Sequence, residues 1–147
     1  MKAVLVSAAA FAALTVAASA GAKQPPIFAQ AQAVGTIGSA FTVDVKPGAM
    51  VLDTITIQPG GSFGWHTHGS PFAVVVKKGT LTVLDPSVHS CVPFTVSKGE
   101  AFVEPAHHVH LARNDTATPV TVYAMYLGIP KGKESNIPEQ APAGSNA

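Results

Sequence analysis

The histidines are the residues of this chain best suited to chemistry, and they are grouped. All six lie between His66 and His110 in a chain of 147 residues. His66 and His68 are separated by one residue, Thr67. On a β-strand, side chains at positions i and i+2 point to the same face, so the two imidazoles would converge on one point and Thr67 would point away. A metal chelate requires this arrangement.

A second group contains His107, His108 and His110. His108 and His110 share a parity, so both could face the interior of a barrel if a strand has begun by His108, whereas His107 would point elsewhere. Neutral imidazole suits Fe, Mn, Zn, Ni and Cu. The histidines therefore favour a divalent transition metal and leave its identity open.

The segments that must position the histidines have the composition of short β-strands. They are rich in Val and Thr, and turn residues such as Pro59–Gly61 and Lys78–Gly79 separate them. Several short strands with turns between them predict an all-β sandwich or barrel. The expected strands cover residues 41–45, 49–58, 72–77, 80–84, 92–97, 101–104, 109–113 and 120–127.

Two spaced patterns around the histidines resemble the two motifs of the cupin superfamily. The first pattern begins at Gly60, reaches His66 and His68 after five intervening residues, and ends at Gly79. This is the order and spacing of the first cupin motif, in which a His-x-His pair is followed by an acidic residue and a glycine. Two such motifs in the right order are far more specific than either alone.

The second pattern contains Gly99, Pro105, His110 and Asn114 at the spacing of the second cupin motif, with His107 where that motif has a glycine. The resemblance implies a double-stranded β-helix, or jelly-roll, barrel that forms a single domain over residues 41–128. It also implies a metal inside the barrel, bound by His66, His68 and His110. The resemblance also permits a homodimer through the outer sheet.

The first motif departs from the family pattern at its acidic ligand. The expected position is 72 or 73, where this chain has Phe72 and Ala73, and no acidic residue lies between Pro59 and Leu84. The implied site resembles that of cupin dioxygenases that use three histidines and no glutamate. His108 is the candidate for a fourth ligand, from its strand parity, and Glu104 is a weaker candidate for a general base.

Three functions agree with these residues. One is a metal-dependent small-molecule dioxygenase or other oxidoreductase, because three neutral ligands leave coordination positions open. Another is a non-catalytic module that binds a metal or a small ligand, because no clear acid or base accompanies the histidines. The third is a cupin whose site has lost its metal, since a fold does not fix a function.

The neighbouring side chains have less specific interpretations. Phe63 and Trp65 have the opposite parity to the histidine pair and are expected to pack against the barrel. Phe72 and the valines that follow it would make the interior apolar, which favours a small, partly apolar ligand. His89 is expected in a solvated loop, and Cys91 is a small buried residue, an exposed thiol or a neighbour of the metal.

The N-terminus has the three parts of a secretory signal peptide over residues 1–20. Lys2 supplies a positive charge, residues 3–18 form an apolar run without charge or Pro, and small residues surround cleavage points after Ala20 and Ala22. The run is too short to span a membrane. We therefore expect a mature protein that is periplasmic or secreted and not bound to a membrane.

Composition limits the remaining classes. Hydrophobic residues make up 47% of the chain and charged residues 12%, which excludes a wholly disordered protein. The net charge is +1 and the basic residues are scattered, so nucleic acid is not an expected partner. Residues 21–40 are expected to form an extended arm and residues 129–147 a disordered tail, because both are rich in small and polar residues.

Overall fold

The computed structural model describes residues 29–90 and 92–145. Contacts divide the chain into two units at Gln32, and the described part of the first unit has no helix or strand. The predicted signal peptide, both cleavage points and Cys91 lie outside the described residues. Within the described part, no helix is long and apolar enough to cross a membrane.

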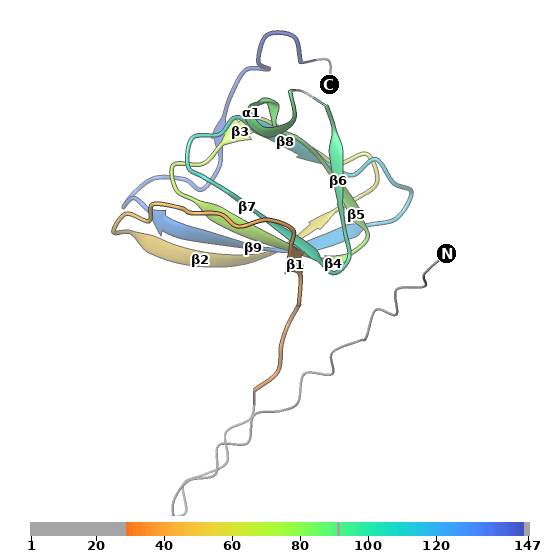
Figure 1. The fold of residues 1–147 in the computed structure, drawn as a ribbon, viewed down its shortest axis with the longest axis horizontal. Helices are drawn as coiled ribbons and strands as arrows, with labels where there is room; N and C mark the ends of the chain where they lie inside the picture. Colours follow the sequence, from red (N-terminus) through yellow and green to blue (C-terminus); the bar gives the residue numbers. More distant parts are fainter. Residues whose placement is uncertain (1–28, 91, 146–147) are drawn as a thin grey trace, which may run out of the picture. The chain divides into compact units, whose positions relative to one another are not determined.

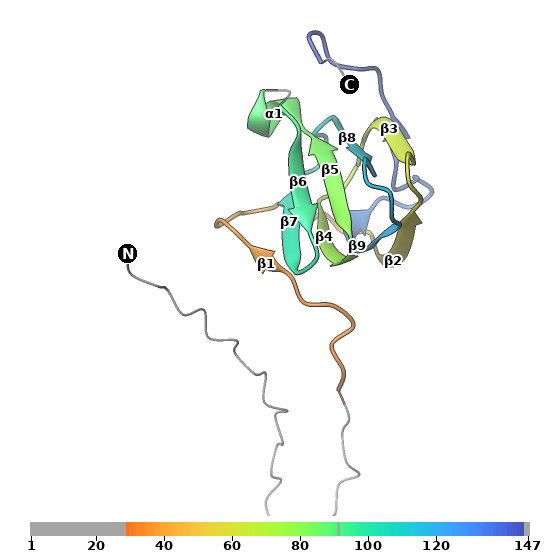
Figure 2. The same ribbon diagram turned by 90° about the vertical axis from the view of Figure 1, so that its right-hand side faces the viewer.

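The unit that follows Gln32 is built almost entirely of β-strands, as predicted. Two five-stranded sheets face each other in Figure 1, and Figure 2 shows them from the side. One sheet has the order β1-β7-β4-β9-β2 and the other β10-β3-β8-β5-β6. The strands are β1 (Thr36–Ile37), β2 (Ala49–Ile57), β3 (Ser62–Thr67), β4 (Phe72–Lys78), β5 (Thr80–Leu84), β6 (Phe94–Ser97), β7 (Glu100–Glu104), β8 (His110–Arg113), β9 (Val120–Ile129) and β10 (Ile137–Pro138).

Neighbouring strands are antiparallel except β1 and β7, which are parallel. This arrangement of two facing sheets is the predicted jelly-roll barrel. One short helix, α1 (Pro86–His89), connects β5 to β6 within the described residues. The Asp85 side chain caps it by accepting a hydrogen bond from the Ser87 N–H at 2.8 Å, and Pro86 suits the first helical turn.

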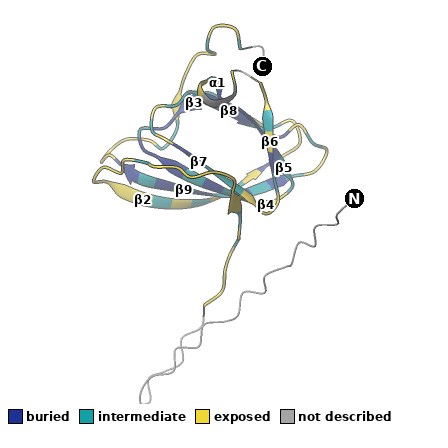
Figure 3. Ribbon diagram, in the orientation of Figure 1, coloured by how far each residue is buried: buried dark blue, intermediate teal, exposed yellow. Residues whose placement is uncertain are grey.

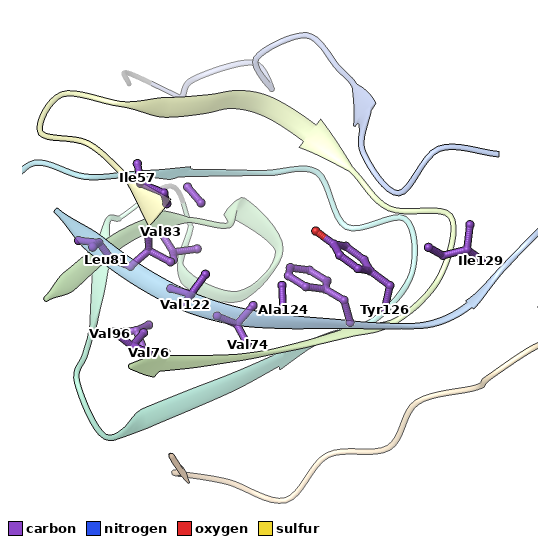
Figure 4. Close-up of a cluster of buried hydrophobic side chains, with 13 residues drawn as sticks. Ile57, Val74, Val76, Leu81, Val83, Val96, Val122, Ala124, Tyr126 and Ile129 are labelled. Carbon is purple, nitrogen blue, oxygen red and sulfur yellow. The ribbon is translucent and has the colours of Figure 1, made fainter. Parts of the chain in front are cut away.

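The barrel interior is filled by side chains that alternate along the strands. Figure 3 shows buried and half-buried residues alternating along β9, and Figure 4 shows the apolar side chains that meet between the sheets. Val74 and Val76 of β4 meet Val122 and Ala124 of β9 in this cluster. Burial of this apolar surface is the main force that holds the two sheets together.

Gly79 lies between β4 and β5 and has a positive φ of 80°. A Cβ at this position would approach the Val120 side chain to 3.0 Å and the Pro119 carbonyl oxygen to 3.2 Å. The last glycine of the first motif is therefore required by both the turn and its packing.

Three predicted elements differ from the structure. Residues 41–45 form no strand, since Phe41 and Val45 are exposed, and the N-terminal arm contributes β1 instead. The sixth strand begins at Phe94 because Pro93 has no N–H to donate to a ladder. The expectation of a disordered tail over residues 129–147 does not hold where β10 pairs with β3, because the edge of β3 offers free backbone groups to an extended segment.

Asn114 connects the end of β2 to the loop that follows β8. Its side chain is fully buried and donates to the carbonyl oxygens of Ile57 at 3.0 Å and Thr118 at 2.8 Å. Its Oδ1 accepts from the N–H of Thr116 at 2.9 Å and from the Thr116 hydroxyl at 2.7 Å. Asn114 is thus a structural residue that joins the end of β2 to the loop after β8.

Replacement of this side chain should therefore destabilise the barrel without touching the histidines. We expect Asn114→Ala to lower the free energy of unfolding by about 3 kcal/mol, because buried backbone groups lose their partners. Asp115→Ala removes a surface pair with Arg113 and a hydrogen bond with the Thr82 side chain but leaves no buried backbone group without a partner, so it should cost only about 1 kcal/mol. Urea denaturation of both variants measures the difference, and equal losses would contradict the assigned role of Asn114.

Candidate metal centre

The antiparallel pairing of β3 with β8 brings the three motif histidines together. His66 lies on β3 directly opposite His110, the first residue of β8, and His68 follows the end of β3. All three side chains are buried, and their candidate ligand atoms lie within 4.8 Å of one another. The His66 and His110 ring centroids are 4.2 Å apart, and each is 5.0 Å from that of His68. The predicted convergence of these three rings is therefore present.

Each ring of this cluster, called the three-histidine cluster below, has its Nδ1 next to an acceptor. The His66 Nδ1 lies 2.9 Å from the Gly64 carbonyl oxygen, and the His68 Nδ1 lies 2.6 Å from the Ser135 carbonyl oxygen. A carbonyl oxygen can only accept, so Nδ1 carries the hydrogen in both rings and Nε2 keeps a free lone pair. Partners of this kind fix the tautomer of metal-binding histidines.

His110 has two such acceptors. Its Nδ1 lies 2.9 Å from Oε2 of the buried Glu104 and 3.1 Å from the His108 carbonyl oxygen. Its Nε2 is therefore also the nitrogen left for a ligand. Glu104 contacts the back of His110 and does not line the cavity at the three-histidine cluster, so the structure places it behind a candidate ligand and not as a general base facing a substrate.

Burial keeps two of the three rings neutral. Loss of hydration lowers the pKa of His66 to about 4 and that of His68 to about 3, although hydrogen bonds to Gly64 and Ser135 act in the opposite direction. Burial also disfavours charge on His110, but the hydrogen bond and negative charge of Glu104 outweigh it and raise the pKa of His110. His66 and His68 are thus in the protonation state that a metal needs at neutral pH.

His108 does not join the three-histidine cluster. Its ring is partly exposed, and its Nδ1 lies 2.9 Å from the Ser87 hydroxyl and 3.5 Å from an oxygen of Asp85. The parity argument was wrong because β8 begins at His110, so strand alternation does not extend back to His108. His107 is exposed and has a φ of 67°, which explains why the family motif has a glycine at this position.

A bulge in β3 changes the orientation of Phe63. The register shifts between Ser62 and Trp65, where Gly64 has a φ of 69°. One extra residue breaks the alternation of the strand, so the Phe63 ring turns to the side of His66, with the ring centroids 5.7 Å apart. The expected packing of Phe63 on the opposite face was therefore wrong.

The three-histidine cluster opens onto a small cavity of about 30 Å³, surrounded mostly by apolar side chains. Phe72 is at one of the two positions expected for the missing acidic ligand. Its ring centroid lies 4.1 Å from that of His68, and its ring stacks on Tyr126 with an angle of 16° between the ring planes. Figure 4 shows the Tyr126 ring rising from β9 into the interior. Sequence analysis did not single out Tyr126, although it shares the parity of the buried Val122 and Ala124.

The donor set fits a metal ion. The His68 Nε2 is buried and has no hydrogen-bond partner among the described residues. A buried imidazole nitrogen without a partner is costly, and coordination to a metal would satisfy it. The structure thus contains a three-histidine cluster that could hold a metal.

The lowered pKa values of His66 and His68 predict how the stability of the metal-free protein changes with pH. Both groups bind protons in the unfolded chain below pH 6.5 but stay neutral in the folded protein, so stability should fall as the pH drops from 6.5 to 5. The slope should approach about 1.4 kcal/mol per pH unit for each histidine. His110, whose pKa is raised, acts in the opposite direction, because the folded protein binds its proton more tightly than the unfolded chain does, and it offsets part of the slope near pH 6.5.

Urea denaturation in the presence of a chelator, at several pH values, measures this slope. His68→Asn keeps a donor for the Ser135 carbonyl oxygen but cannot titrate, so it should remove about half of the slope. His107→Asn, at an exposed position, should keep the wild-type slope. The same slope in all three proteins would show that burial does not hold these rings neutral.

The sequence and the fold of this chain are similar to those of known proteins. Residues 53–126 match the family model described as Cupin domain. The polyketide cyclase RemF from Streptomyces resistomycificus has a similar structure, with a TM-score of 0.54, 16% identity, and coverage of 67% of this chain and 66% of RemF. A search of curated proteins found no significant match.

Two further solved structures are similar. BH2720 from Bacillus halodurans has a TM-score of 0.50 and 21% identity, with 60% of this chain and 68% of BH2720 covered. The DMSP lyase DddQ from Ruegeria pomeroyi DSS-3 has a TM-score of 0.51 and 16% identity, with 60% of this chain and 42% of DddQ covered. At these identities the likeness shows the fold alone. With the family match over half of its length, the chain belongs to the cupin family.

Proposed function

We propose that this cupin binds a divalent transition metal through the Nε2 atoms of His66, His68 and His110. The observation that carries the proposal is the shared arrangement of the three rings. Every Nδ1 lies next to an acceptor, while the candidate ligand atoms of the rings lie within 4.8 Å of one another. Such a cluster needs no rearrangement of tautomers before it binds a metal.

The donor set is neutral, and Fe, Mn, Zn, Ni and Cu all accept imidazole ligands. A metal held by three protein ligands can act as a Lewis acid toward a small molecule bound at its open positions. Side chains around the three-histidine cluster set its polarity and its charge. Phe72 and Tyr126 exclude water from one side of the three-histidine cluster, and the Glu104 carboxylate offsets positive charge through His110.

Within this proposal, the enzymatic function that the site supports best is a small-molecule dioxygenase or other oxidoreductase. A reaction that takes place on the metal needs no separate acid or base. Among the described residues that line the cavity, the only titratable side chains are the three histidines and Tyr126. The named activities of RemF and DddQ, a cyclase and a lyase, differ from each other, so the fold does not choose the reaction.

The same observation supports a second candidate, a non-catalytic module that holds a metal or a small apolar ligand. The two candidates differ in one measurable respect. An oxidoreductase should consume oxygen or change the metal's oxidation state when a suitable small molecule is added, whereas a binding module should bind the molecule without turnover.

Metal content tests the proposal directly. Protein purified without added metal, or loaded and then dialysed, should retain close to one metal ion per chain. His66→Ala and His68→Ala leave two ligands and should weaken binding by more than the roughly 100-fold that loss of an outer hydrogen-bond partner can cost. His110→Asn should act likewise while it keeps a polar group next to the buried Glu104.

The matched controls are His107→Asn and His108→Asn, since both residues lie outside the three-histidine cluster. Both variants should retain the wild-type metal content, measured by elemental analysis after dialysis. Equal metal content in all five variants would overturn the ligand assignment. A wild-type protein that holds no metal under any loading condition would place the chain among cupins without a metal.

We further propose that the mature protein acts in the periplasm or is secreted. The support is the charge, apolar run and small-residue cleavage points of residues 1–22. The exported protein should begin at Gly21 or Lys23, and intact mass measurement identifies its first residue. An exported protein that retains residues 1–20 would contradict this proposal.

A further inference from the structure

The segment 135–139, called the C-terminal strap below, lies along β3. Its strand β10 pairs antiparallel with β3 and places Pro138 opposite His66. After β10, the backbone N–H of Glu139 donates to the carbonyl oxygen of Trp65 at 2.9 Å. In Figures 1 and 2 the blue C-terminal part of the chain passes beside β3 before the chain ends. The strap is therefore attached to the strand that carries the first ligand candidate.

The strap contacts the three-histidine cluster directly. His68 Nδ1 lies 2.6 Å from the Ser135 carbonyl oxygen, across 67 residues of sequence. The next residue, Asn136, lines the same cavity, and its Oδ1 is buried without a hydrogen-bond partner among the described residues. The strap thus supplies part of the wall of the site and, among the described residues, the only hydrogen bond of the His68 ring.

His68 needs this contact more than His66 does. His66 is a residue of β3 and is held by pairing with His110, whereas His68 lies beyond the end of the strand. A neutral imidazole without an acceptor at Nδ1 can carry its hydrogen on Nε2 instead, and that hydrogen would block ligation through Nε2. Phe72 and Tyr126 pack against the His68 ring, but neither offers an acceptor to Nδ1, so the tautomer of His68 depends on the strap.

We propose that the C-terminal strap is a positioning element of the metal centre, in which the Ser135 carbonyl oxygen holds His68 with its Nε2 lone pair free. The effect on metal affinity rests on the proposed function. The effect on the His68 tautomer does not, because it is a property of the metal-free protein. The strap is thus a third sequence element of the site, in addition to the two cupin motifs.

The substitution Glu139→Pro tests this inference without changing a residue that lines the cavity. It removes the N–H that donates to Trp65, and it follows Pro138, so the chain stays extended at this point. The double variant Ile137→Gly with Glu139→Pro weakens the pairing of β10 further. Gln140→Pro is the matched control, since Gln140 is an exposed residue just beyond the strap.

Two readouts report on His68. Imidazole ¹⁵N shifts in the metal-free protein at neutral pH give its tautomer, and competition with a chromophoric chelator gives the affinity for Zn²⁺. We expect wild type and Gln140→Pro to show a single tautomer with hydrogen on Nδ1. The strap variants should show a tautomer mixture and a Zn²⁺ affinity about 10- to 100-fold lower, with an unfolding midpoint close to that of the wild type.

The inference is overturned if the strap variants lose amide protection at residues 137–139 and yet keep the wild-type tautomer and Zn²⁺ affinity. A similar loss in Gln140→Pro would also overturn it, since the effect would not be specific to the strap. If the wild type binds neither Zn²⁺ nor any of the other divalent transition metals, the proposed function fails, but the tautomer measurement still decides whether the strap positions His68.

Discussion

The antiparallel pairing of β3 with β8 is the interaction on which the centre depends. It sets His66 opposite His110, so the backbone pairing of two strands brings together two ligand candidates from distant parts of the sequence. The Asn114 side chain and its backbone bonds to Gly60 and Gly61 anchor the far end of this strand pair. A slip of the register by one residue would turn one ring away from the interior.

The acceptors that contact the Nδ1 atoms leave the Nε2 atom of each ring as the candidate ligand atom. A carbonyl of β3, a carbonyl of the C-terminal strap and the Glu104 carboxylate each contact one Nδ1 atom. The acceptor of His66 lies two residues away on the same strand, whereas Ser135 and Glu104 belong to other elements and contact His68 and His110 only in the folded barrel. Burial then disfavours protonation of His66 and His68, which leaves their lone pairs available at neutral pH.

The sequence predicted an all-β barrel from its pattern of short strands and turns, and the resemblance to the two cupin motifs implied the three converging histidines. Strand alternation predicted that His66 and His68 share a face, although β3 ends one residue before His68, and the resemblance to the second cupin motif added His110. The sequence could not predict the turn of Phe63 toward the site, since a one-residue bulge at Gly64 leaves no periodic signal. Nor could it predict the strap, because two residues of β10 are too few for a pattern and their pairing depends on an edge elsewhere in the fold.

The acidic residue that the first motif lacks has a counterpart in the Glu104 carboxylate, which contacts His110. Phe72 is at one of the two expected positions, and its cross-strand neighbour on β7 is Glu104, so a carboxylate lies one strand away from that place. From there it contacts the Nδ1 of His110 and raises the pKa of that ring, where a direct ligand would have contacted the metal. A carboxylate behind a histidine makes the ring a stronger donor and offsets part of the metal's charge without using a coordination position. The three-histidine cluster therefore has a carboxylate behind one ring and an apolar wall beside it, and no carboxylate is among the described residues that line its cavity.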